Sequence, residues 1–297
     1  MTLVKKAWNR YRADGLGGVV RTAWRRTSTS LRLRLHACNP VRRRTVARIV
    51  REGTVDERLR RCGLAPIPLE LSAPAFHRWF ADTPYPDEYC PGPWRQALPE
   101  KALEHYLSLE LLRLTPDAVC VDVASQDSPF PDLVRSRLGC RMYRQDLEYP
   151  AGLHGDRIGG DAAELPLPPD SVTAMTLHCS FEHFEGRSDV EFLREAARVL
   201  VPGGRVCILP LYLRDDYLNV LDPRATRPLH ADPEAKVYSI SDWPGGHFSR
   251  YYSPEVFRTR IVDAVPAFSL RLYRLTNPEA AGPGCYLRYA AVFEKPI

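Results

Sequence analysis

Several patterns that would place the chain in a special class of protein are missing from its sequence. Its 297 residues contain no run of about 18 uninterrupted apolar residues, so no membrane-spanning helix is predicted. The eight cysteines form neither a C-x-x-C pair nor a Cys/His cluster with zinc spacing, and therefore no metal site is predicted. The first residues also lack the apolar core of a secretory signal peptide. Together these absences predict a cytoplasmic protein with reduced thiols.

Motifs of other enzyme classes are absent as well. The sequence has no G-x-x-x-x-G-K-[ST] phosphate-binding loop and no G-x-S-x-G nucleophile elbow. The glycine cluster at residues 15–18 follows an expected helix and not a strand, so it is not predicted to hold phosphate. Hydrophobic residues make up 44% of the chain and charged residues 26%, which is ordinary for a soluble protein and excludes wholesale disorder.

The net charge of +5 conceals an uneven distribution along the chain. Residues 1–65 contain 17 Lys and Arg against 4 Asp and Glu, a balance of +13, whereas residues 66–297 contain 24 against 32, a balance of −8. Within residues 1–35, Trp8 and Trp24 each lie on an apolar helical stripe that arginines flank. Such basic amphipathic helices suit an anionic membrane surface. The alternatives are packing on the main domain, a nucleic-acid arm and an organellar transit peptide.

The chain is predicted to have three parts. Residues 1–63 form a basic amphipathic helical extension, and residues 64–99, which are rich in proline and aromatic residues, form a connector or a lid. Residues 100–297 form the main domain.

From residue 100 onward, strands and helices are expected to alternate. The expected strands are residues 119–123, 141–146, 157–159, 172–179, 205–211, 268–276 and 286–293, and the expected helices are residues 100–114, 131–138, 188–200 and 253–262. This alternation predicts a parallel sheet with helices on both faces, and the last two strands, which no helix separates, predict an antiparallel hairpin. The predicted fold class is α/β, with a Rossmann-like, doubly wound sheet of seven strands.

Four phrases, in this order, resemble the class I S-adenosylmethionine-dependent methyltransferases of the type 11 kind. They are GDAAELPLPPDSV at residues 160–172, SFEHF at 180–184, EAARVLVPGGR at 195–205 and YYSPE at 251–255. The resemblance covers about residues 100–295. It implies a Rossmann-like sheet, S-adenosylmethionine as the cofactor and methyl transfer to an acceptor.

The resemblance also implies where the cofactor binds. Asp122 ends the first strand, Asp146 ends the second near the place where an acid would hold ribose hydroxyls, and Asp161 resembles the acid that contacts adenine. Solvation at a turn or helix capping is the alternative for these acids, and it is favoured for Glu148, a rival ribose ligand. The predicted cofactor-binding residues are Asp122, Ala124, Ser125, Gln126, Asp146, Asp161, Ala162 and Cys179.

The loop after the first strand departs from the family pattern D-x-G-x-G-x-G. Ala124, Gln126 and Ser128 stand where the family has glycines that let the backbone approach the cofactor. Ser125, Gln126 and Ser128 could instead contact the methionine end of the cofactor through their side chains. The alternative is a cofactor-less scaffold protein in a biosynthetic complex.

Methyl transfer from a sulfonium requires an acceptor held in line, and a general base assists when the acceptor is a hydroxyl. The loop after the fourth strand faces the methyl group in this fold, and Tyr212 and Asp216 follow the fifth strand near the same place. Arg250 and His247 could line the acceptor pocket or bind an anionic acceptor, whereas a role in the core is the alternative for His178. The predicted catalytic candidates are His183, His178, Asp215 and His247.

The predicted function is methylation of a hydroxyl, or a similar nucleophile, on a small molecule or glycan near the membrane surface, as in polysaccharide biosynthesis. Residues 1–35 are predicted to contact that anionic surface. An RNA methyltransferase with a basic arm is a further alternative. It is disfavoured because the sequence has neither an aromatic-rich RNA-binding module nor an N-P-P-[YF] signature, so no nucleic-acid partner is expected.

Overall fold

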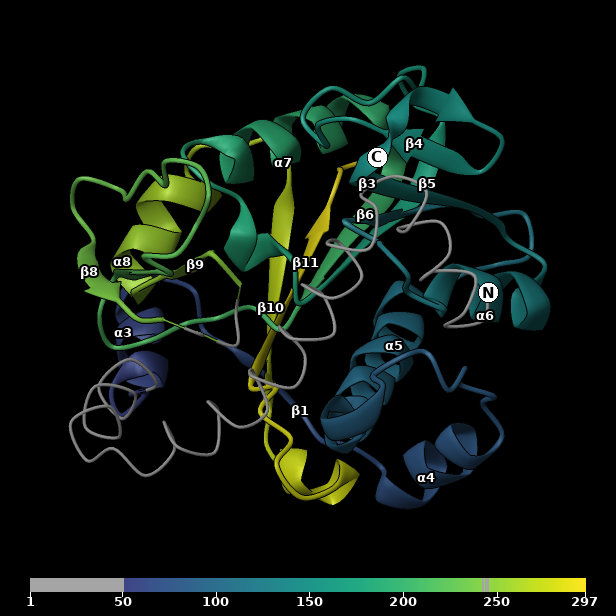
Figure 1. Ribbon diagram of the computed structural model, residues 1–297, viewed down its shortest axis with the longest axis horizontal. Helices are drawn as coiled ribbons and strands as arrows, with labels where there is room; N and C mark the ends of the chain where they lie inside the picture. The colour runs from purple at the N-terminus through teal and green to yellow at the C-terminus, as the bar shows by residue number, and fades with distance from the viewer. Residues whose placement is uncertain (1–50, 242, 244–245) are drawn as a thin grey trace, which may run out of the picture.

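The computed structural model describes residues 51–241, 243 and 246–297 (Figure 1). The predictions made for the basic extension up to residue 50, including the amphipathic helices and their membrane contact, lie outside the described residues. No helix among the residues described is long and apolar enough to cross a membrane.

Eight strands form the main sheet, in the order β1-β10-β11-β6-β5-β2-β3-β4. Their bounds are β1 Ile67–Leu69, β2 Val119–Val123, β3 Arg141–His154, β4 Arg157–Gly159, β5 Val172–His178, β6 Leu200–Leu209, β10 Ser269–Leu275 and β11 Tyr289–Glu294. β11 runs antiparallel to its neighbours β6 and β10, and the other neighbouring strands are parallel. The predicted α/β fold with an antiparallel C-terminal hairpin is confirmed.

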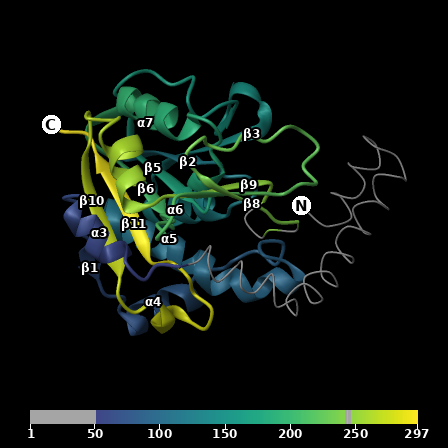
Figure 2. The ribbon, with the colours of Figure 1, turned by 90° about the vertical axis from the view of Figure 1, so that its left-hand side faces the viewer.

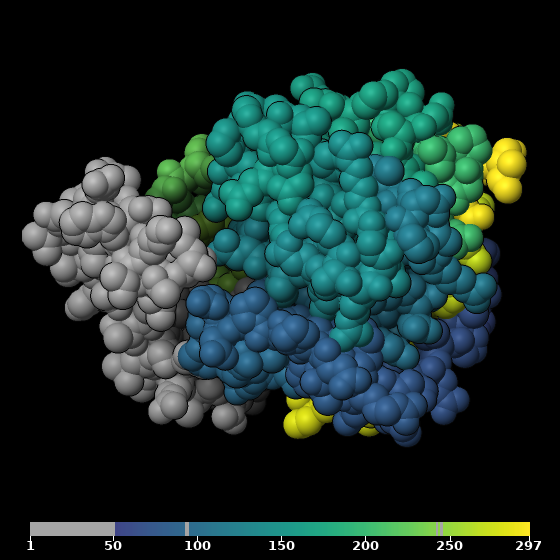
Figure 3. Space-filling model, turned by 90° about the vertical axis from the view of Figure 1, so that its right-hand side faces the viewer, coloured from purple at the N-terminus to yellow at the C-terminus, as the bar shows by residue number. Residues whose placement is uncertain are grey.

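The sheet has eight strands where seven were predicted. The additional strand, β1, pairs in parallel with β10 and covers what would otherwise be an open edge (Figure 2). β1 belongs to residues 64–99, the segment expected to be a connector or a lid. The same segment contains α4, whose Phe76 is fully buried among residues of α5. The surface of residues 64–99 is continuous with that of the main domain (Figure 3).

Helices cover both faces of the main sheet (Figure 1). Their bounds are α3 Val55–Arg61, α4 Ala73–Ala81, α5 Leu98–Leu112, α6 Phe130–Leu138, α7 Ser188–Val199 and α8 Pro254–Val256, which continues as a π-helix over Phe257–Val262. One apolar cluster joins the sheet to α3, α7 and α8, and a second joins it to α4, α5 and α6. Burial on both faces explains why most residues of β2 and β5 are apolar.

The strand order reverses between β2 and β5. From β2 the chain continues outward to β3 and β4, and it then returns to the other side of β2 as β5 and β6. In an open parallel sheet, ligands bind beyond the carboxyl ends of the strands at such a switch point. The carboxyl ends of β2 and β5 are therefore where a functional site is expected.

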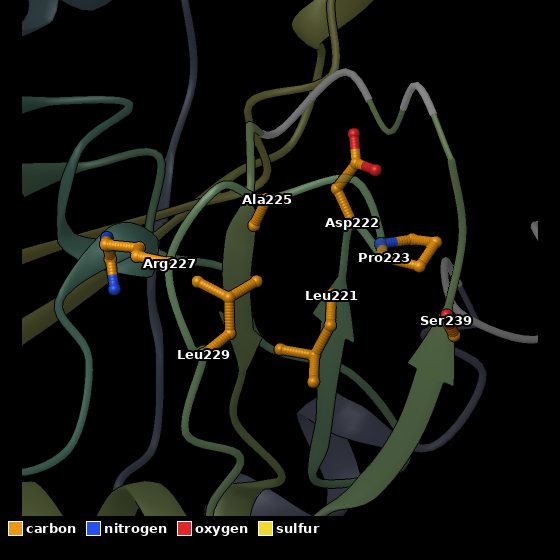
Figure 4. Close-up of a pocket in the computed structure, with 7 residues that line it drawn as sticks. All are labelled: Leu221, Asp222, Pro223, Ala225, Arg227, Leu229 and Ser239. Carbon is orange, nitrogen blue, oxygen red and sulfur yellow. The ribbon is translucent and has the colours of Figure 1, made fainter.

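A second, three-stranded sheet lies between β6 and α8 in the sequence and was not predicted. It has the order β8-β7-β9 and consists of β7 Leu218–Leu221, β8 Lys236–Ser239 and β9 Phe248–Tyr251. Among the residues described, a pocket on this sheet lies apart from the switch point and contains no predicted site residue (Figure 4). Its lining residues are Leu221, Asp222, Pro223, Ala225, Arg227, Leu229 and Ser239.

Candidate functional site

Asp122, near the end of β2, is a buried residue that links the elements meeting at the switch point. It is 1% exposed, and its carboxylate accepts hydrogen bonds of 2.8 Å from Ser125 Oγ and from Thr176 Oγ1 on β5. His178 Nδ1 lies 3.2 Å from the same carboxylate. Asp122 therefore holds the loop after β2 against the end of β5.

The loop after β2 contains no glycine, yet two of its residues have the left-handed backbone conformation that usually requires one. Ala124 has φ 53° and Gln126 has φ 43°, two left-handed conformations at positions where the family has glycines. The loop is also tied to β3, because Ala124 N donates to Gln145 Oε1 at 3.1 Å and Gln126 N donates to Asp146 Oδ2 at 2.9 Å. Hydrogen bonds to β3 thus compensate for the strain of the two non-glycine residues.

This strain predicts that glycine is tolerated in the loop. A left-handed non-glycine residue costs about 1–2 kcal/mol, and glycine loses about 0.5–1 kcal/mol more backbone entropy on folding. Ala124→Gly is therefore expected to leave the free energy of unfolding unchanged or to raise it by up to about 1.5 kcal/mol. Urea unfolding measures this, with Ala197→Gly near the C-terminal end of α7 as the control that should lose about 0.5–1 kcal/mol. If both variants lost the same free energy of unfolding, the inference that Ala124 is strained would be wrong.

Asp146 and Asp161 lie in different surroundings. Asp146 is 5% exposed, and its two oxygens accept from Gln126 N and Glu148 N, each at 2.9 Å. A carboxylate has about four lone-pair sites, so Asp146 retains capacity for hydroxyl donors. Asp161 is exposed and accepts from Ala163 N at 2.9 Å in the turn after β4, next to the buried Ala162. The structure brings Asp146 to the loop, while Asp161 lies one strand farther out.

Polar side chains of α5 meet the end of β5. Glu104 is fully buried, and it accepts from Lys101 Nζ at 2.9 and 3.1 Å and from Cys179 Sγ at 3.2 Å. Cys179, in the left-handed conformation with φ 48°, also lies 3.5 Å from the Tyr212 hydroxyl and 3.4 Å from the Tyr286 hydroxyl. Of these residues, sequence analysis named only Cys179 and Tyr212.

Several buried polar atoms near this point have no hydrogen-bond partner among the residues described. They are Glu100 Oε1, His105 Nε2, Ser180 Oγ and Glu182 Oε2. All four residues are at most 5% exposed. Burial raises the pKa of Glu182, against the effect of His183, and it raises the pKa of Glu100 to about 7, with a further contribution from Glu104. Unpaired buried polar groups are rare in folded proteins, so their concentration here indicates a place for a ligand or ordered water.

The two histidines near the end of β5 differ in exposure. His178 has a side chain that is 7% exposed, with Nε2 2.7 Å from Ser108 Oγ and its ring edge-on to Phe130. His183 has a side chain that is 37% exposed, with Nδ1 2.6 Å from the Phe248 carbonyl oxygen and Nε2 3.6 Å from Glu182. The contacts of His178 with Ser108 and Asp122 therefore fix its ring in a structural position. His183 links the loop after β5 to β9.

The other predicted acceptor-side residues lie apart from this cluster. Asp215 binds the start of α3 through Gly53 N, Thr54 N and Thr54 Oγ1. Burial alone would raise the pKa of Asp215, but the hydrogen bonds from Thr54 and the charge of Arg51 lower it below its usual range. Asp215 is thus occupied by the chain's own residues. His247 is exposed at the start of β9.

Arg250 does not line an acceptor pocket, contrary to the expectation. It is fully buried, donates to Asp232 at 2.8 and 2.9 Å and to Asp189 at 2.9 Å, and so joins β9 to α7. Tyr252 and Arg260 donate to the same Asp189, each at 2.7 Å. The two remaining N–H groups of Arg250 donate to the carbonyl oxygens of Phe184 and Gly186, so none of its five donors is left for an anionic acceptor. No group of His, Cys, Asp and Glu that could hold a metal ion occurs among the residues described.

The segment that forms the switch point matches a known family. Residues 110–208 match the family model described as "Methyltransferase domain", a range that begins in α5 and ends in β6. The chain carries a methyltransferase domain. The predicted membership in the class I S-adenosylmethionine-dependent methyltransferases is confirmed for this domain.

Curated relatives of the methyltransferase domain have matching names. The demethylmenaquinone methyltransferase of Mycobacterium marinum is 36% identical over 103 residues, which are 30% of this chain and 42% of that protein. The demethylmenaquinone methyltransferase of Corynebacterium glutamicum is 32% identical over 101 residues, which are 30% of this chain and 43% of that protein. The chain thus spans less than half the length of these relatives.

Two solved structures have a low overall similarity to this chain. One is a chain of the complex between the Haloferax volcanii Trm112 methyltransferase activator and the putative methyltransferase, with a TM-score of 0.45 and 14% identity over 76% of this chain and 98% of that chain. The other is the Burkholderia thailandensis 1,6-didemethyltoxoflavin-N1-methyltransferase with bound 1,6-didemethyltoxoflavin and S-adenosylhomocysteine. It has a TM-score of 0.43 and 17% identity over 78% of this chain and 95% of that chain. The sequence match at residues 110–208 remains the basis for the methyltransferase domain.

Proposed function

We propose that the protein is an S-adenosylmethionine-dependent methyltransferase that acts on a hydroxyl of a small molecule or glycan. The observation that carries the proposal is the loop after β2, which keeps two left-handed residues at the switch point although it has no glycine. A sequence released from cofactor binding would have no reason to retain this strained conformation. The loop, Asp146 and the unpartnered polar atoms fit a polar, hydroxyl-bearing cofactor.

Two parts of the chain would hold the cofactor. Asp146 has lone pairs left for ribose hydroxyls at the end of β3. Lys101 and Glu104 form a pair of opposite charges beside Cys179, and this pair matches the carboxylate and the ammonium group of an amino acid. When bound, the cofactor supplies an electrophilic methyl group on a positively charged sulfur. The chain's own residues then have to orient an acceptor and remove its proton.

Calorimetric titration with S-adenosylhomocysteine tests this function. We expect micromolar binding to the unaltered protein and a loss of at least tenfold in Asp146→Ala, because a bidentate acceptor of ribose hydroxyls is removed. The matched control is Glu148→Ala, an exposed acid two residues farther along the chain, which should bind normally. Folded protein that binds neither S-adenosylmethionine nor S-adenosylhomocysteine would instead favour the cofactor-less scaffold.

We also propose that the basic extension brings the enzyme to an anionic membrane surface, where a lipid-linked acceptor would be found. The support is the charge balance of +13 over residues 1–65. The full chain should sediment with vesicles that contain an anionic lipid, and less so at high salt. A chain without residues 1–35 that sediments equally well would overturn this part of the proposal.

A further inference from the structure

Glu100 is a buried carboxylate with one free oxygen at the edge of the candidate site. It lies in the first turn of α5 and is 2% exposed. Its Oε2 accepts from Tyr286 N at 2.8 Å, while Oε1 has no partner among the residues described. The hydroxyl of the same Tyr286 lies 3.4 Å from Cys179 Sγ, which connects Glu100 to the end of β5.

The cations of this cluster are already paired. Lys101 binds Glu104, and Arg214 binds Glu52. Among the residues described, neither Glu100 nor Glu182 forms an ion pair with a lysine or an arginine, although His183 Nε2 lies 3.6 Å from Glu182, and each carboxylate has an unpartnered oxygen. An acceptor with a phosphate or carboxylate at its reacting end would be repelled, whereas hydroxyl groups would supply the missing hydrogen-bond donors.

Tyrosine rings provide an apolar wall beside these carboxylates. The rings of Tyr212 and Tyr286 are stacked with centroids 6.3 Å apart, and Tyr251 meets Tyr212 edge-on at 5.4 Å. Tyr286 is 41% exposed, so the wall reaches the surface of the protein. Aromatic faces next to hydrogen-bond acceptors suit a ring-shaped ligand that carries hydroxyl groups.

We propose that the acceptor is an uncharged, hydroxylated ring compound that binds against Tyr212 and Tyr286, and that Glu100 takes up its proton. This inference rests on the proposed methyltransferase function. The acceptor oxygen forms the bond to the methyl carbon, and the methyl–sulfur bond breaks with its electron pair left on sulfur. The proton of the acceptor hydroxyl moves to Glu100 Oε1.

The surroundings of Glu100 set the pH range in which it can act. The titratable groups that face it are Glu104 and Lys101 on α5 and Cys285 on the loop before β11. The Cys285 thiol is close enough to hydrogen-bond the Glu100 carboxyl, and this contact and Lys101 lower the pKa of Glu100 against the larger effect of burial. Burial and Glu104 raise its pKa to about 7, so the carboxylate form predominates above that pH. The rate of methyl transfer is expected to fall as the pH drops below this value.

The test measures transfer of tritiated methyl groups to a panel of probes. The uncharged probes are methyl mannoside, methyl rhamnoside and catechol, and the anionic probes are mannose phosphate and glucuronate. We expect transfer to at least one uncharged probe and not to the anionic ones. On the best probe, Glu100→Gln should lower kcat by about 100-fold and remove the decrease at low pH, with S-adenosylhomocysteine affinity unchanged. Glu100→Asp, which keeps a carboxylate, should retain the pH dependence.

Glu110→Gln is the matched control, since Glu110 is an exposed residue of the same helix. The proposal is overturned by preferential transfer to the anionic probes, or by transfer to none of the uncharged probes in protein that binds S-adenosylhomocysteine. It is equally overturned if Glu100→Gln behaves like the control. If the unaltered protein does not bind S-adenosylhomocysteine, the proposed function fails first, and this inference fails with it.

Discussion

Glu104→Gln is expected to weaken the binding of S-adenosylhomocysteine by about 10- to 100-fold. Its carboxylate is the negative half of the buried Lys101–Glu104 pair proposed to receive the amino-acid end of the cofactor. A hydrogen bond to a charged group contributes about 1.5–3 kcal/mol, which corresponds to that range of affinity. Lys101→Met should have a similar effect, because it removes the partner of the cofactor carboxylate. Calorimetric titration measures both variants.

Methylthioadenosine separates this role from a general effect on the fold. It has the nucleoside and the thioether but no amino-acid group, so both variants should bind it as the unaltered protein does. Glu110→Gln, on the exposed side of the same helix, should change neither affinity. If Glu104→Gln loses methylthioadenosine to the same extent, the charge pair stabilises the domain and does not recognise the amino-acid end.

Arg250→Met is expected to lower the free energy of unfolding by about 3–5 kcal/mol. Arg250 is fully buried between Asp189 and Asp232, and its removal leaves two carboxylates without their main cation. Breaking a buried pair is far more costly than breaking an exposed one, because the remaining charges stay desolvated. Urea unfolding at neutral pH measures the change.

Arg258→Met is the control for Arg250→Met. Arg258 also pairs with an aspartate, Asp263 at 2.7 Å, but the two side chains are 41% and 46% exposed. An exposed pair contributes about 0–1 kcal/mol, so this variant should unfold almost as the unaltered protein does. If both variants lost a similar free energy of unfolding, burial would not determine how much these ion pairs contribute to stability.

The central elements could be predicted from the sequence because local patterns determine them. β2 and β5 are short and mostly apolar, and α7 has a clear helical period. The phrases around Asp161 and Glu182 lie at fixed places next to these elements. The small strands β7 and β8 could not be predicted in the same way. They have four residues each, and pairing with distant segments defines them more than their own composition does.

The chemistry of single side chains was harder to predict than the elements that carry them. Arg250 and Asp215 lie close in sequence to the expected acceptor side, yet their partners are Asp189 and Thr54, which are far away along the chain. In contrast, Glu100 and Glu104 precede every phrase that resembles the family. Only the three-dimensional structure brings Glu104 to Cys179 and Glu100 to the backbone of Tyr286.

The contacts between α5 and the end of β5 depend on how α5 is rotated about its own axis. Lys101, Glu104, His105 and Ser108 follow the spacing of a single helical face, and this face meets the end of β5 at Cys179 and His178. One residue corresponds to a turn of about 100° around the helix axis. A single residue inserted into α5 before Lys101 would leave the face in place, whereas one inserted between Glu104 and Ser108 would split it. The spacing within this helix, and not only its composition, therefore determines which polar side chains reach the end of β5.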